Sequence, residues 1–83
     1  MLPNTVITSQ RMRVYNLLAL TDVYGLTRMQ IASRLGIERA SVCRRVAELR
    51  DEGKLIIRRT GLCPITGERA EFLGVIKNEQ NYE

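Results

Sequence analysis

Residues 38–52 combine arginine and small side chains in a pattern that suits contact with a nucleic acid. Val42, Val46 and Leu49 lie four and three residues apart, so on a helix they form one buried stripe. The rest of this helix carries small and cationic residues, namely Arg39, Ala40, Ser41, Arg44 and Arg45. The planar guanidinium group of arginine matches the geometry of phosphates and of guanine edges. A helix with one apolar face packed against the core and an opposite face of small and cationic residues is suited to enter a DNA groove.

A second short helix is expected directly before this segment. Thr27 can cap its start, and Gln30 three residues later completes a capping box. Leu26 and Ile31 can pack together across the cap as a hydrophobic staple. Gly36 ends the helix, because glycine enters the left-handed conformation without steric cost. Two helices joined by so short a turn brace each other, so this helix would hold the arginine-rich one in place.

The remaining segments predict one more helix and a β-hairpin. The helix is expected over residues 9–21, and residues 1–8 before it are expected to form an extended arm or a short strand. Two β-rich runs, residues 54–60 and 69–76, predict an antiparallel hairpin, and residues 77–83 are expected to form a flexible tail. Three aromatic side chains are expected in the core, namely Tyr15, Tyr24 and Phe72.

The loop between the two β-rich runs is longer than the usual hairpin loop of about two to five residues. It covers residues 61–68 and includes the apolar residues Leu62 and Ile65. Exposed apolar side chains at such a place indicate that the loop folds back or touches a partner.

Several independent spacings agree across residues 9–76. They are carried by Thr27, Ile31, Ala32, Leu35, Gly36, Val42, Val46, Leu49, Gly53, Leu55 and Ile56. This pattern resembles the winged helix-turn-helix and is similar, more loosely, to MarR-type regulators and to small winged-helix proteins encoded by bacteriophages. The resemblance implies one α+β, mainly α domain over residues 1–83, in which three helices are followed by a β-hairpin wing. Residues 38–52 would be the recognition helix and residues 55–76 the wing, but Glu38 stands where such domains often carry Ser or Thr.

The recognition helix implied by this resemblance divides its candidate DNA contacts into two groups. Ala40, Ser41 and Arg44 are expected to contact base edges, because such a helix places its N-terminal half on the bases. Arg39 and Arg45 lie at the two edges of the apolar stripe and are expected to contact phosphates. Phosphate and sugar contacts make up about half or more of protein–DNA hydrogen bonds.

Four further arginines are candidates outside the recognition helix. Arg28, in the first turn of the preceding helix, is expected to clamp a phosphate, and Arg58, Arg59 and Arg69 are expected to contact the backbone or the minor groove. Two structural alternatives stand beside these assignments. The helix arginines can form a solvated face with ion pairs to Glu48, each worth only about 0.5 kcal/mol. The hairpin arginines can be edge-strand charges that prevent aggregation of the sheet.

The composition favours a globular domain with a polyanionic partner. The chain of 83 residues is 45% hydrophobic and 27% charged, and its net charge is +4, which favours a polyanionic partner. Twelve of the thirteen lysine and arginine residues precede residue 72, so binding would depend on where the arginines point. Without a long apolar run or a secretory signal, the expected location is cytoplasmic, with no membrane partner.

Catalysis and metal binding have little support in this sequence. The chain has no histidine, no glycine-rich phosphate loop and no credible carboxylate pair, so an enzyme is not expected. Cys43 and Cys63 have neither C-x-x-C spacing nor a histidine partner, which predicts free thiols and no metal or cofactor.

The sequence therefore predicts sequence-specific binding of double-stranded DNA by a small prokaryotic or phage transcriptional regulator. The chain lacks room for the terminal helices through which MarR-type proteins dimerise, so we expect a monomer or weak homodimer, with pairing favoured on a two-fold operator. The alternative is a winged-helix interaction module that binds a host or partner protein without reading DNA. Leu62, Ile65 and Glu38 favour this alternative, whereas the arginines favour DNA.

Overall fold

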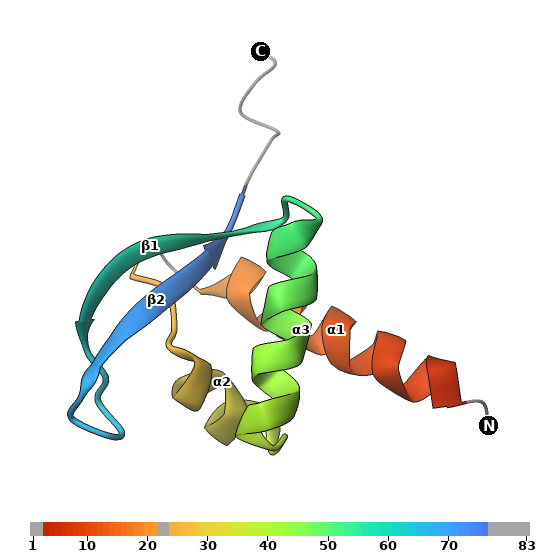
Figure 1. Cartoon of the computed structure of the whole chain (residues 1–83), viewed down its shortest axis with the longest axis horizontal. Helices are drawn as coiled ribbons and strands as arrows, with labels where there is room; N and C mark the ends of the chain where they lie inside the picture. Colours follow the sequence, from red (N-terminus) through yellow and green to blue (C-terminus); the bar gives the residue numbers. More distant parts are fainter. Residues whose placement is uncertain (1–2, 22–23, 77–83) are drawn as a thin grey trace, which may run out of the picture.

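The computed structural model describes the backbone of residues 3–21 and 24–76, with side chains from residue 10 onward (Figure 1). Three helices precede a two-stranded antiparallel hairpin. The elements are α1 (Pro3–Leu20), α2 (Arg28–Leu35), α3 (Arg39–Asp51), β1 (Leu55–Leu62) and β2 (Arg69–Val75). This α+β, mainly α order confirms the predicted succession of elements. The expected tail, residues 77–83, lies outside the described residues.

The first helix begins earlier than the sequence predicted. It starts at Pro3, so residues 3–8 are helical and the expected extended arm or strand is wrong for them. Proline favours this position, because its φ angle suits the first helical turn and its missing N–H would have no partner there. The helix ends at Leu20, one residue before its predicted end.

The predicted capping chemistry of α2 is confirmed. The Thr27 hydroxyl accepts a hydrogen bond from the Gln30 amide at 3.1 Å, and the Thr27 amide donates to Gln30 Oε1 at 3.0 Å. At the other end, Gly36 adopts the left-handed conformation with φ of 66°. Both ends of this helix are therefore determined by residues within one turn of it.

The two ends of α3 differ in how completely they are capped by hydrogen bonds. Glu38 is its N-cap residue but forms no side-chain capping hydrogen bond. At the C-terminal end the Gly53 amide donates to the Arg50 carbonyl and the Lys54 amide to the Leu49 carbonyl, both at 2.9 Å. These two bonds form a Schellman motif with Gly53 at φ 77°, and this glycine directly follows the C-cap residue Glu52.

Replacing Glu38 by serine is expected to raise the free energy of unfolding by about 0.5–1 kcal/mol. The backbone of Glu38 already has a capping conformation, with ψ of 143°, and serine would supply the missing acceptor for an amide of the first turn. Thermal unfolding of Glu38→Ser and Glu38→Ala would measure the effect, since alanine removes the charge without adding a cap. Equal melting temperatures for the two variants would contradict this prediction.

The hairpin extends further and carries a shorter loop than predicted. The strands pair from Leu55 with Val75 to Leu62 with Arg69, and the register shifts between Ile57 and Arg59. Gly61 and Leu62 therefore belong to β1, and the loop is residues 63–68. Leu26 forms an isolated antiparallel bridge with Leu73.

One hydrophobic cluster joins the three helices to the hairpin. Its buried members are Val14, Leu18, Leu26, Ile31, Ala32, Val42, Val46, Leu49, Leu55, Leu73 and Val75. Phe72 is also buried and Tyr15 packs against the cluster, as predicted. The prediction for Tyr24 is wrong, because its side chain is 64% exposed in the turn that follows α1.

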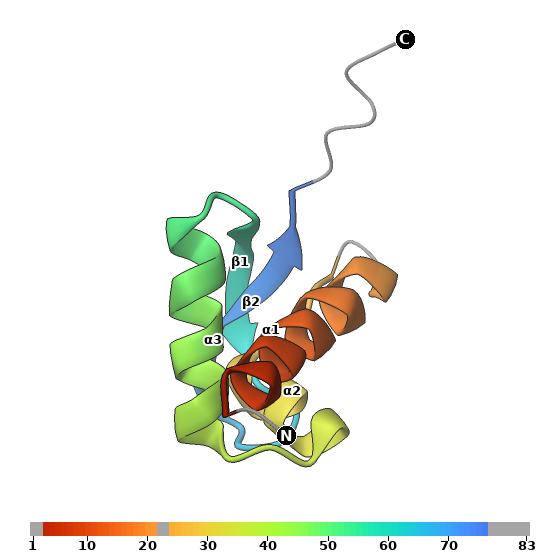
Figure 2. The same ribbon diagram turned by 90° about the vertical axis from the view of Figure 1, so that its right-hand side faces the viewer.

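The arrangement leaves one long side of α3 uncovered. Figure 1 shows α3 crossing α1, with the hairpin curving away on the side opposite the first turns of α1. In the perpendicular view α3 forms an outer edge of the molecule, and α1, α2 and the hairpin all lie to one side of it (Figure 2). Among the described helices none combines the length and apolar character needed to cross a membrane.

Candidate nucleic-acid interface

The uncovered side of α3 carries the predicted base-contacting residues. The apolar stripe is buried against the core, while Ala40 and Arg44 are exposed and Ser41 is half-buried. Within the described part of the chain, Arg44 forms no ion pair and no side-chain hydrogen bond. The alternative pairing of Arg44 with Glu48 is therefore not formed, and its guanidinium group is available for a ligand.

Arg45 lies beside Arg44 in sequence but is buried, so its assignment as an exposed phosphate contact is corrected. Its side chain turns toward α1, where Nη2 donates to Glu48 Oε2 at 3.1 Å and Nη1 donates to Gln10 Oε1 at 3.5 Å. Only 4% of the residue is exposed. A buried guanidinium needs such partners, and Arg11, which pairs with Glu48 at 3.6 Å, completes a polar contact between α1 and α3.

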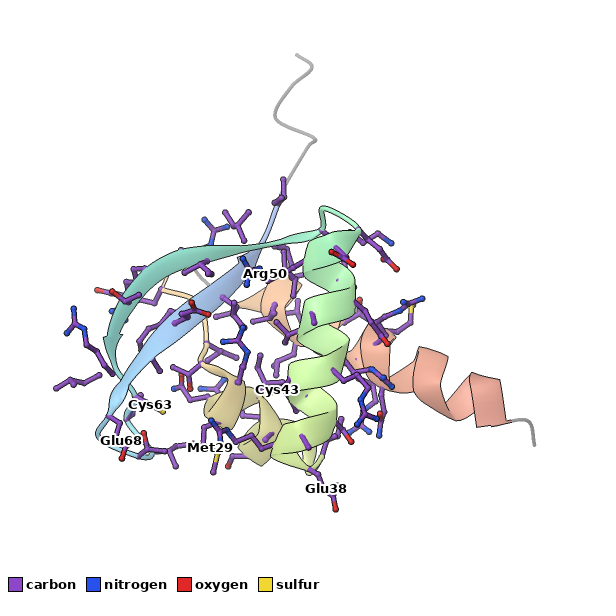
Figure 3. All side chains as sticks on the ribbon, in the orientation of Figure 1. Met29, Glu38, Cys43, Arg50, Cys63 and Glu68 are labelled. Carbon is purple, nitrogen blue, oxygen red and sulfur yellow. The ribbon has the colours of Figure 1, made fainter. Side chains whose placement is uncertain are left out.

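The side of α3 that faces the hairpin carries an arginine that the sequence reasoning missed. Figure 3 shows Arg50 and Cys43 on this side, with Glu38 at the far end of the helix. Arg39, Cys43 and Arg50 are four and seven residues apart, which places them along one line of a helix. Arg50 is exposed and forms no ion pair with any described residue. The spacing of the three residues was a usable signal, but a recognition helix is expected to contact bases through its N-terminal half, and Arg50 lies in the last turn of α3.

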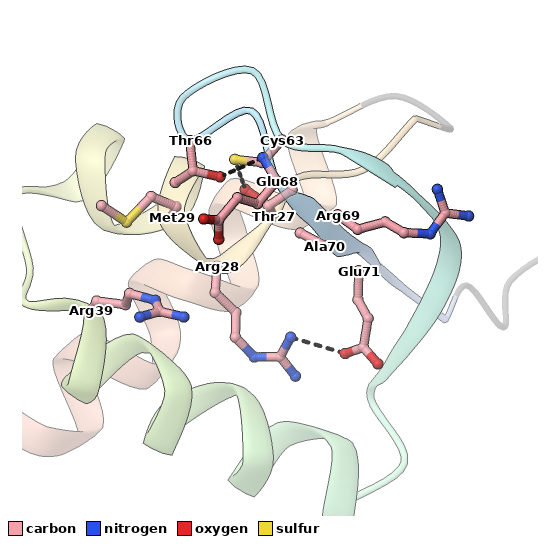
Figure 4. Close-up of a pocket in the computed structure, with 10 residues that line it drawn as sticks. All are labelled: Thr27, Arg28, Met29, Arg39, Cys63, Thr66, Glu68, Arg69, Ala70 and Glu71. Atoms are coloured by element: carbon pink, nitrogen blue, oxygen red, sulfur yellow. Dashed lines mark hydrogen bonds and ion pairs between the residues drawn. The ribbon is translucent and has the colours of Figure 1, made fainter.

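A hollow of about 350 Å³ lies between the start of α2, the start of α3 and the outer half of the hairpin (Figure 4). Its lining residues are Thr27, Arg28, Met29, Arg39, Cys63, Thr66, Glu68, Arg69, Ala70 and Glu71. Three candidate arginines from three different elements, Arg28, Arg39 and Arg69, therefore border one concavity. Arg39 and Arg69 are exposed and unpaired among the described residues.

Arg28 already has an anionic partner in this hollow. Its Nη1 lies 2.9 Å from Glu71 Oε1, and both side chains are only partly exposed. Figure 4 shows these two side chains turned toward each other, while Arg69 points away from them. A pair this accessible to water is worth about 0–1 kcal/mol, so a phosphate can replace the carboxylate.

Arg59 lies on the hairpin face opposite the one that borders this hollow. It stands across from Phe72 in the strand register, and its Cζ lies 3.9 Å from the centroid of the Phe72 ring. Side chains alternate between faces along a strand, so Phe72 and its neighbour Glu71 point to opposite sides. The Arg59 guanidinium also lies 5.3 Å from the Tyr24 ring. Arg59 thus covers aromatic side chains and does not join Arg28.

Arg58 shares this second face. A Cβ atom at Gly74 would collide with the Arg58 side chain, which shows that Arg58 lies across that glycine. Its Nη2 donates to the Val75 carbonyl at 3.0 Å. The structure therefore separates the three hairpin arginines, since Arg69 borders the hollow beside α2 and α3 whereas Arg58 and Arg59 do not.

The hairpin loop is tied to the start of α2 through a buried cysteine. Cys63 is 1% exposed, and its Sγ lies 3.1 Å from Thr27 Oγ1. Within the loop, the Cys63 amide donates to the Glu68 carbonyl at 2.8 Å and the Gly67 amide donates to the Cys63 carbonyl at 2.7 Å. Both cysteines are free thiols, as predicted, but Cys63 also fixes the loop against the cap residue of α2.

The surroundings of Cys63 change its acidity. Burial raises the pKa of the thiol, but hydrogen bonds from the Thr27 side chain, from the backbones of Thr66 and Ile65 and from the Thr66 side chain lower it to about 7. A thiol whose pKa is lower in the folded protein binds fewer protons there than in the unfolded chain. The contribution of Cys63 to stability is therefore greatest above the unfolded pKa and is lost as the pH falls through 7.

We expect the free energy of unfolding of the native protein to increase between pH 7 and pH 9. The increase that Cys63 contributes should be absent in Cys63→Ser. Denaturant unfolding at several pH values in this window measures the slope. The matched control is Cys43→Ser, which should keep the native pH dependence because the half-buried Cys43 has no such partners among the described residues. An unchanged slope in Cys63→Ser would contradict the assignment.

The apolar residues of the hairpin tip are exposed. Leu62 is 66% and Ile65 is 49% exposed, so neither folds back onto the domain.

Over residues 10–21 and 24–76, no three cysteine or carboxylate side chains are grouped to hold a metal ion. Comparison of the chain with protein-family models, with curated proteins and with solved structures finds no match.

Proposed function

We propose that this chain is a winged helix-turn-helix protein that binds double-stranded DNA in a sequence-specific manner. In this proposal α3 lies in the major groove, the hairpin is the wing, and the first turn of α2 faces a phosphate. The role that follows is that of a small prokaryotic or phage transcriptional regulator that acts by occupying an operator, with any homodimer forming on the DNA.

The observation that carries this proposal is a set of unpaired arginines on two sides of α3. Arg44 lies on the uncovered side, and the others lie on or next to the side that faces the hairpin. Arg44 and Arg50 lie on α3 itself, and Arg39 and Arg69 border the hollow next to it. In the described residues none of the four is neutralised by an ion pair. Clustered, unpaired guanidinium groups repel one another, so a surface that gathers them is suited to a polyanion.

Two of the three ion-paired acids among the described residues are held away from this surface. Glu48 and Glu52 pair with Arg11 toward α1, at 3.6 Å and 2.9 Å. Glu71 alone among the ion-paired acids borders the hollow, where it holds Arg28. The positive side of α3 is thus kept apart from the side that anchors the helix.

Replacing Glu71 by glutamine is expected to raise affinity for any DNA duplex several-fold. The change releases Arg28 for a phosphate, so the plot of log affinity against log salt concentration should steepen by about 0.9. Glu68→Gln is the matched control, because Glu68 lines the same hollow without an ion pair among the described residues. A salt dependence that steepens equally in both variants would contradict the release of Arg28.

The proposed function is tested by selecting binding sites from random duplex DNA and titrating the selected duplex with salt. We expect one recovered sequence motif and an affinity that falls linearly in log salt concentration. Recovery of no motif, or an affinity that does not respond to salt, would overturn DNA reading.

A further inference from the structure

A second hollow opens to solvent on the hairpin face that carries Arg59. It encloses about 480 Å³, within the range of about 300–1,000 Å³ typical of ligand sites, and three elements border it. The end of α1 supplies Leu17 and Leu20, α2 supplies Arg34, and the hairpin supplies Arg59 and Phe72. This hollow takes no part in the DNA contacts proposed above.

Apolar side chains form the floor of this hollow and part of its rim, beside the polar side chains of Thr21 and Gln30 and the two arginines. Phe72 is buried beneath it and Leu17 is half-buried. At the rim, Leu20 is 87% exposed and Tyr24 is 64% exposed, the first being the most exposed large apolar side chain in the described residues. Apolar side chains gathered at the edge of a concavity mark a surface that is covered in a complex.

The described residues that line the hollow carry charge of one sign. Arg34 and Arg59 line it, no acidic residue does so among the described residues, and neither arginine has an ion pair there. Arg59 is held over two aromatic rings, which fixes its plane and leaves the N–H groups at its edge for an acceptor. The complement of this surface is a segment with carboxylates beside apolar side chains.

We propose that this hollow binds a short acidic segment of a partner protein that carries leucine or aromatic side chains. The apolar side chains would cover Leu20 and the floor, and the carboxylates would pair with Arg34 and Arg59. DNA fits less well, because a phosphate backbone offers nothing to bury an exposed leucine. Since α3 lies on another side of the molecule, the partner and the operator can be bound at the same time.

The test begins with a random dodecapeptide phage library selected on the immobilised full chain. We expect the enriched peptides to combine Asp or Glu with Leu, Phe or Trp, and one of them, labelled with fluorescein, serves as the anisotropy probe. Leu20→Ser and Arg34→Glu should each weaken its binding about tenfold, through lost apolar burial and reversed charge. Met12→Ser and Arg50→Glu are the matched controls, an exposed apolar residue and an unpaired arginine elsewhere, and should bind as the native chain does.

Three results would overturn this inference. They are enrichment of no peptide or of peptides without acidic residues, native affinity in Leu20→Ser and Arg34→Glu, and full displacement of the peptide by a DNA duplex. Leu20→Ser should also keep native DNA affinity, which separates this surface from the DNA interface. If the native chain binds the peptide but no DNA, the proposed function fails while the peptide site stands.

Discussion

Replacing Arg44 by alanine is expected to lower affinity for the selected operator by about 10- to 100-fold and to leave affinity for random duplex nearly unchanged. Arg44 is exposed on the uncovered side of α3 and has no ion pair in the described residues, so docking of α3 in the major groove would aim its guanidinium at base edges. A bidentate contact between arginine and guanine is worth about 1–3 kcal/mol of discrimination. Competition binding against operator and random duplex at two salt concentrations measures both affinities.

The comparison variant for Arg44 is Arg69→Ala, which should weaken both duplexes together. Phosphate attraction is the same for every sequence, so each lost contact should also make the salt dependence shallower by about one unit. Arg58 and Arg59, which the sequence placed with Arg69, lie on the other hairpin face and should contribute little. If Arg44→Ala weakens both duplexes equally, α3 does not read the bases. If none of these variants changes DNA binding, the proposed function is replaced by the alternative of a module that binds a partner protein without reading DNA.

Replacing Gly25 by alanine is expected to lower the free energy of unfolding by about 2–4 kcal/mol. Gly25 has φ of 76°, and an added Cβ atom would collide with the carbonyl oxygen of Leu73. That oxygen accepts a hydrogen bond from the Leu26 amide at 3.1 Å, and the Leu73 amide returns one to the Leu26 carbonyl at 2.8 Å. The methyl group would therefore separate β2 from the segment that leads into α2.

Gly67→Ala is the matched control for this change. Gly67 has nearly the same conformation, with φ of 75°, but an added Cβ atom there meets no atom within 4 Å. Gly67→Ala should lower the free energy of unfolding by only about 1–2 kcal/mol, because alanine must adopt the left-handed conformation there. The difference between the two variants therefore measures the cost of the collision with Leu73. Chemical denaturation of both variants gives the two free energies of unfolding. Equal decreases in the two variants would show that the Leu73 backbone moves aside without loss of stability.

The sequence by itself determined the features that depend on residues within one helical turn. The capping box of Thr27 and Gln30 and the left-handed Gly36 involve neighbours only, so the ends of α2 were predictable to the residue. The spacing of Val42, Val46 and Leu49 likewise determined which side of α3 is buried, because periodicity and burial are linked on any helix packed against a core. The succession of three helices and a hairpin followed from such local signals.

Only the tertiary structure decided which arginines remain available. Arg44 and Arg45 are adjacent and chemically identical, yet one is exposed and the other is buried, because α1 crosses α3 where Gln10 reaches Arg45. The register shift in β1 likewise decided that Arg59 covers Phe72 and does not border the hollow beside α3. Neither outcome follows from the spacing of the arginines themselves.

The same holds for the contacts that shape the candidate interface. Cys63 meets Thr27 across 36 positions of the chain, and Arg28 meets Glu71 across 43. The spacing of residues in the sequence indicates which side chains share one face of a helix or strand. Which other element covers that face depends on how distant segments of the chain pack together. For that reason the candidate surface was predictable as one face of a helix. The packing of the hairpin against α1 and α2 decided its hollow, the pairing of Glu71 with Arg28 and its separation from the second hollow.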